Sequence, residues 1–118
     1  MTSAQFRRLA LAYPTVVEGV HQGHADFRVG GRIFASLGHP NEAFAAVMLS
    51  PQDQTFLMRD YPSVFTPAAG KWGASGSTIV RLAEADTGPI AAALEAAWRR
   101  RAPKRLVRAL DGETTSAD

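Results

Sequence analysis

The chain has 118 residues, of which 46% are hydrophobic and 20% are charged, with a formal net charge of +2. These values are typical of one soluble globular domain and exclude a disordered chain or a collagen-like fibre. The sequence contains no cysteine, which excludes disulfides, thiolate metal sites and cysteine nucleophiles. We expect a single domain over residues 1–111, followed by a polar tail over residues 112–118.

The apolar stretches are short, and the longest of them, such as residues 43–49, cannot span a bilayer. The charges near the N-terminus are not followed by the apolar segment of a signal peptide. The sequence therefore predicts a cytoplasmic protein with no membrane partner.

Hydrophobic periodicity predicts both helices and strands. Amphipathic patterns, bounded by prolines and capping residues, predict helices at residues 3–13, 51–61, 87–101 and 104–110. Alternating or continuous apolar runs predict strands at residues 16–20, 25–29, 33–37, 43–49 and 78–82. Because short turns join the first four strands, we expect a mainly antiparallel sheet of about five strands with helices packed on one face, a two-layer α+β fold.

The pair Gly30-Gly31 predicts a tight hairpin between the second and third strands. A two-residue loop would pair Val29 with Arg32, whereas a three-residue loop with a bulge would place Phe27 opposite Ile33. The bulged hairpin agrees better with the alternation of apolar residues, so it is the expected form.

Residues 66–77 are predicted to form the longest loop, and this segment contains Lys71 and Trp72. A tryptophan in a glycine-rich loop either anchors the loop on the core or offers a stacking surface to a nucleic-acid base. Anchoring is the more common role, because a long loop needs a contact that holds it in place.

Basic residues gather near the C-terminal end, and no acidic residue lies between Trp98 and Leu110. A local cluster of this kind produces a positive field although the whole chain is nearly neutral. Such a cluster either contacts nucleic-acid phosphates or forms ordinary solvated surface. Its members are Arg99, Arg100, Arg101, Lys104, Arg105 and Arg108.

Motifs of catalysis and metal binding are scarce. His21 and His24 have a spacing that could supply two metal ligands, but zinc and iron sites need three or four. The sequence has no nucleophile elbow, no zinc-protease motif and no phosphate-binding loop. We therefore predict no enzymatic activity, no catalytic residues, no metal site and no cofactor.

Several segments together resemble the MmcQ/YjbR family, in matching order and spacing over roughly residues 4–108. The matching segments are residues 23–29, 31–37, 70–73, 78–82 and 102–106. The resemblance implies a compact α+β domain with a bacterial frataxin-like sheet and a DNA-binding role of the double-wing type. The family's last strand often begins Gly-Trp-Thr, whereas this chain reads Gly76-Ser77-Thr78.

The basic cluster and the resemblance lead us to expect a non-enzymatic DNA-binding protein that contacts mainly the phosphate backbone. Two protruding loops, the hairpin tip and residues 66–77, would act as wings. The residues predicted to contact DNA are Arg99, Arg100, Lys104, Arg105 and Arg108 in the helices, Lys71 and Trp72 in the loop, and Arg28 and Arg32 in the hairpin.

The alternative is a module that binds a protein or a small ligand through an exposed sheet face. Phe34, Ser36, Ile79 and Arg81 would lie on that face, and an apolar patch there would suit a protein partner or a homodimer. A pocket bounded by His21, His24 and Trp72 would suit a small ligand instead.

Overall fold

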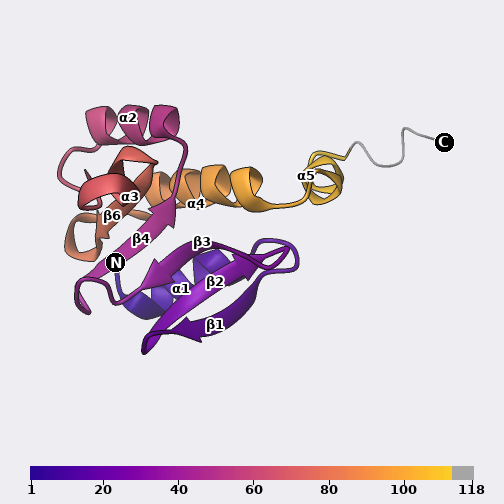
Figure 1. Cartoon of the computed structure of the whole chain (residues 1–118), viewed down its shortest axis with the longest axis horizontal. Coiled ribbons are helices and arrows are strands. Elements are labelled where there is room, and N and C mark those ends of the chain that lie inside the picture. Colours follow the sequence, from indigo (N-terminus) through magenta and orange to yellow (C-terminus); the bar gives the residue numbers. More distant parts are fainter. Residues whose placement is uncertain (113–118) are drawn as a thin grey trace.

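The computed structural model describes residues 1–112 (Figure 1). Of the predicted polar tail, only Gly112 falls within these residues. The helices are α1 (Ser3–Leu11), α2 (Pro51–Asp60), α3 (Gly70–Ala74), a 3-10 turn η1 (Leu82–Glu84), α4 (Thr87–Arg101) and α5 (Lys104–Leu110). The strands are β1 (Val17–His21), β2 (His24–Val29), β3 (Arg32–Leu37), β4 (Phe44–Met48), β5 (Phe65–Pro67) and β6 (Ser77–Arg81).

The six strands form one sheet in the order β1-β2-β3-β4-β6-β5, and every neighbouring pair is antiparallel. The predicted α+β class is therefore confirmed. The central position of β4 explains why its residues are apolar on both faces. In Figure 1, α1 and α4 lie behind β2, β3 and β4, and both helices contact β3.

The core lies between the sheet and these two helices. Ile90, Leu94 and Trp98 follow one another at four-residue steps along α4, and all three are fully buried. Tyr13 stacks on Trp98, with 6.0 Å between ring centroids, and the Trp98 Nε1–H donates to the carbonyl oxygen of Pro14 at 3.2 Å. These contacts hold the segment after α1 against the end of α4.

The β2–β3 hairpin differs from the expected form. Gly30 and Gly31 make a two-residue loop, with Val29 opposite Arg32, and the bulge lies further along the ladder. Phe27 is therefore opposite Ala35 rather than Ile33. Because the bulge adds one residue to β3, Phe34 and Ala35 are both buried, and the prediction that Phe34 lies on an exposed sheet face is wrong.

The predicted loop over residues 66–77 is also wrong, because this segment contains the end of β5, the helix α3 and the start of β6. The side chain of Gln54 holds the short helix α3 in place. Its side-chain Nε2 donates to the carbonyl oxygens of Gly73 and Ser77 and to Thr78 Oγ1, at 3.0–3.2 Å. This buried amide fastens α3 to α2 and β6. The close approach of Gly73 to the Ala68 carbonyl leaves no room for a larger residue.

Candidate nucleic-acid interface

The hairpin tip and the break between α4 and α5 touch each other. Pro103 ends α4, because Ala102 before it adopts an extended conformation (φ −68°, ψ 147°). Gly30, with φ +58°, lies so near Pro103 that an added Cβ would be 2.9 Å from the proline Cδ. This contact brings Arg32, at the start of β3, to the basic helices.

A cavity of about 540 Å³ lies at this junction, and we call it the basic groove. Five cationic side chains line it, and among residues 1–112 no acidic side chain does. They come from three separate segments: Arg32 from the hairpin, Arg99 and Arg100 from α4, and Lys104 and Arg108 from α5. Ala102, Pro103 and Val107 complete its wall.

Arg99 is already occupied by carboxylates. Its guanidinium donates to both oxygens of Asp111, at 2.7 and 3.0 Å, and to Glu95 at 2.9 Å. These hydrogen bonds raise the pKa of Arg99 and lower that of Asp111. Arg99 therefore ties the end of α5 to α4, and its charge is largely neutralised.

The other four groove cations make no ion pair with any residue among 1–112. They are Arg32, Arg100, Lys104 and Arg108, and all four are exposed. Their charges remain available to a ligand.

Arg101 lies close to this set, although the sequence did not assign it to the site. Its pKa is lowered first by burial and then by repulsion from Arg100 and Arg32. Its Nε is buried and has no hydrogen-bond partner among the described residues. The run of three arginines was visible in the sequence, but only the folded hairpin reveals that Arg32 adds to it.

Two of the predicted arginine contacts lie outside the groove. Arg105 is exposed on α5 but does not line the cavity. Arg28 pairs with Asp26 through two hydrogen bonds of 2.9 and 3.0 Å, and these raise the pKa of Arg28. Because the Asp26 carboxylate is only 2% exposed, Arg28 mainly neutralises a buried charge.

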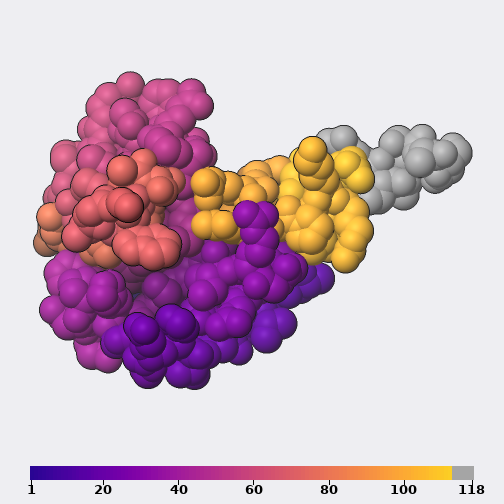
Figure 2. Space-filling model, in the orientation of Figure 1, coloured from indigo at the N-terminus to yellow at the C-terminus, as the bar shows by residue number. Residues whose placement is uncertain are grey.

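Lys71 and Trp72 lie on α3, at the end of the molecule where α4 begins, whereas α5 follows the other end of α4 (Figure 1). Trp72 is 75% exposed, so the expected anchoring on the core does not occur. The space-filling view shows α3 and α5 on the same broad face (Figure 2). In this view α3 and α5 are well apart.

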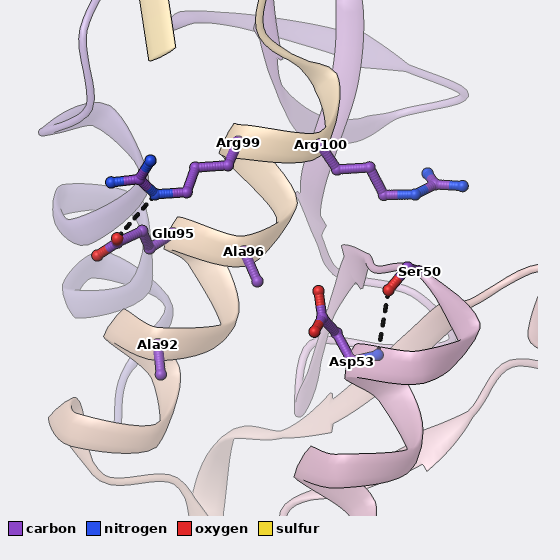
Figure 3. Close-up of a pocket in the computed structure, with 7 residues that line it drawn as sticks. All are labelled: Ser50, Asp53, Ala92, Glu95, Ala96, Arg99 and Arg100. Atoms are coloured by element: carbon purple, nitrogen blue, oxygen red, sulfur yellow. Dashed lines mark hydrogen bonds and ion pairs between the residues drawn. The ribbon is translucent and has the colours of Figure 1, made fainter. Parts of the chain in front are cut away.

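A second groove, of about 630 Å³, separates α4 from the start of α2 (Figure 3). Ala92 and Ala96 leave this gap, and Ser50 and Asp53 face it from α2. Arg99 and Arg100 line both grooves, and in Figure 3 the Arg100 side chain extends toward the α2 side while Arg99 points the other way, to Glu95. Arg100 therefore lies where the two grooves meet.

The structure gives little support to a metal site at the histidines. His24 packs edge-on against His39, with 6.2 Å between ring centroids. Neither groove is lined by His21, His24 or Trp72. Within residues 1–112, no three His, Asp or Glu side chains gather closely enough to hold a metal ion.

The fold and the groove define a small α+β protein with one antiparallel sheet and a cationic cleft at the end of its longest helix. The family model for YjbR matches residues 11–100, and the chain belongs to this family. A search of curated proteins and a search of solved structures each found no significant match. In the part of the chain that the structure describes, no helix has both the length and the apolar character needed to cross a membrane.

Proposed function

We propose that this protein binds nucleic acid, with DNA as the expected partner, through phosphate contacts in the basic groove and without catalysis. One observation carries the proposal: four cations without carboxylate partners among residues 1–112, from three separate segments, converge on one cavity that no acidic residue lines. Arginine and lysine at such a site favour phosphate oxygens, to which guanidinium groups can donate two parallel hydrogen bonds.

The geometry supports contacts with the backbone rather than with base edges. The groove cations lie at a hairpin tip, a helix end and a helix of 7 residues, and none of these elements is a long helix with a free face for the major groove. Phosphate contacts fix position and carry little sequence information. We therefore expect weak sequence preference and strong dependence on salt.

The alternative, a protein or ligand site on the open sheet face, has less support. The strand register places Ser36, Ala46 and Ile79 in one row across that face. None of them belongs to the strongly exposed large hydrophobic residues, but Val17, on the edge strand β1 and opposite Arg28, is 64% exposed. One exposed valine at the edge gives this face little driving force for a stable protein partner or a homodimer.

Fluorescence anisotropy of labelled double- and single-stranded DNA over a range of salt concentrations tests the proposal. With three or four phosphates neutralised, the logarithm of the binding constant should fall with the logarithm of salt concentration with a slope of about −3. Arg100→Ala should weaken binding by about tenfold and reduce the slope by roughly one.

Arg59→Ala is the matched control, because Arg59 is exposed on α2, pairs with Asp60 and lines neither groove. It removes the same charge at a different place. Equal losses for Arg59→Ala and Arg100→Ala, or binding that is independent of salt, would contradict a specific role of the basic groove.

A further inference from the structure

The cations of the basic groove converge on one cavity instead of following a line. A strand backbone presents one charge about every 3.4 Å along the helix axis, so a surface that only tracks DNA spreads its cations. Here four unpaired side chains surround about 540 Å³, a volume in the range of small-molecule sites. This arrangement fits a compact, highly charged group better than a run of single charges.

The density of positive charge around the groove also favours a compact, highly charged anion as its ligand. Burial is the main cause of the lowered pKa of Arg101, and repulsion from Arg100 and Arg32 lowers it further. Of the nearby acids, Glu95 and Asp111 are bound to Arg99, and Asp53 faces the second groove, which Arg100 also lines. An anion with two charges would relieve this repulsion more than the single charge of an internal phosphodiester.

We propose that the basic groove is a phosphomonoester site, which takes the terminal phosphate of a nucleic-acid strand. A phosphomonoester carries up to two negative charges at neutral pH and has three free acceptor oxygens, which match guanidinium donors from several directions. Val107 and Pro103 supply an apolar wall beside the cations, against which the adjoining sugar can pack. The strand-end source of this phosphate rests on the proposed function, whereas a free nucleotide offers the same chemical group.

The test compares three thymidine oligonucleotides labelled at the 3′ end. One is an octamer with a 5′-phosphate, the second is the same octamer with a 5′-hydroxyl, and the third is a nonamer with a 5′-hydroxyl. The nonamer has the same number of phosphate groups as the phosphorylated octamer, so it controls for the added phosphate. We expect the phosphorylated octamer to bind roughly fivefold more tightly than either control, the factor for one extra charge about 4 Å from a cation in water.

Arg32→Ala and Lys104→Ala should each abolish this preference, because both side chains line the groove and are exposed, so their removal leaves the core intact. Arg59→Ala should retain it. Binding of all three oligonucleotides without preference for the 5′-phosphate would overturn the inference and leave the proposed function standing.

Amide NMR spectra with thymidine monophosphate and with thymidine separate the two sources of the phosphate. Shifts at Gly30, Arg32 and Lys104 with the monophosphate only, in a protein that binds no oligonucleotide, would keep the phosphomonoester site and overturn the proposed function. No response to any of these ligands would overturn both.

Discussion

Gly30 and Pro103 lie far apart in the sequence, yet the backbone of one packs against the ring of the other, with 2.9 Å from an added Gly30 Cβ to the Pro103 Cδ. Their contact joins the β2–β3 hairpin to the break between α4 and α5. The basic groove exists because of this junction, since Arg32 comes from one side of it and Arg100, Lys104 and Arg108 from the other.

Gly30→Ala should destabilise the protein more than Gly31→Ala. Both glycines have positive φ, so each substitution costs roughly 1–2 kcal/mol from the left-handed backbone alone. Only Gly30 has a neighbour within 4 Å of an added Cβ. Urea denaturation of the two variants measures the difference, and equal losses of unfolding free energy would show that the hairpin does not press on Pro103.

Asp111 should stabilise the docking of α5 only while it is ionised. Because Arg99 lowers the pKa of Asp111 below the usual 3.8, this stabilisation is complete above that value and is lost as the pH falls through the lowered pKa. The wild type should therefore be more stable than Asp111→Asn near neutral pH. This difference should begin to shrink only below about pH 4 and disappear as the pH falls past the lowered pKa of Asp111. Denaturant unfolding over this pH range measures the difference, and a constant gap at all pH values would contradict the assignment.

Gln54→Ala should lower the free energy of unfolding by about 1–3 kcal/mol, because it leaves buried acceptors in α3 and β6 without their donor. Gln54→Glu should cost more, since a carboxylate cannot donate to these oxygens. Gln52→Ala, on the exposed side of the same helix, is the control and should change stability by less than about 0.5 kcal/mol. Thermal unfolding of the three variants measures these differences. If Gln54→Glu does not lower the stability, α3 does not depend on the hydrogen bonds of this amide.

Trp72→Ala should affect nucleic-acid binding only when the strand is long enough. Helix α4, with 15 residues, is about 22 Å long, and in Figure 1 α3 and α5 lie toward its opposite ends. Because stacking contributes about 1–3 kcal/mol per base, the variant should lose at least several-fold affinity for a long single strand and none for a short one. Its stability should not change, as the side chain is 75% exposed.

Phe56→Ala removes another exposed aromatic side chain, on α2, and serves as the control in the same anisotropy titrations. If Trp72→Ala and Phe56→Ala bind a long single strand equally well, Trp72 is not a stacking surface for bases.

Much of the fold follows from local sequence. Proline positions, the Ser50 cap of α2 and the four-residue spacing from Ile90 to Trp98 fix helix ends and the buried face of α4. The tight turn at Gly30-Gly31 and the antiparallel order of neighbouring strands are local properties as well, although the expected three-residue loop was wrong. The family resemblance, which the matching family model confirms, depends on the same segments.

Tertiary structure decided the features that depend on distant partners. Residues 66–77 lack the periodicity of a helix, and α3 is held in place because Gln54 of α2 donates to the Gly73 carbonyl of α3 and to the Ser77 carbonyl of β6. The bulge buries Phe34, which alternation alone would have placed on the open face.

The basic cluster shows the same division between sequence and structure. The sequence shows the arginines and the lysine of this cluster, but it does not show which of them form ion pairs with carboxylates. Arg99 and Arg28 form ion pairs with Asp111 and Asp26, respectively. Arg32 lines the groove although it comes from another part of the chain. Charge is a property of each residue, whereas the pairing and convergence of charges depend on distances that only the folded chain sets.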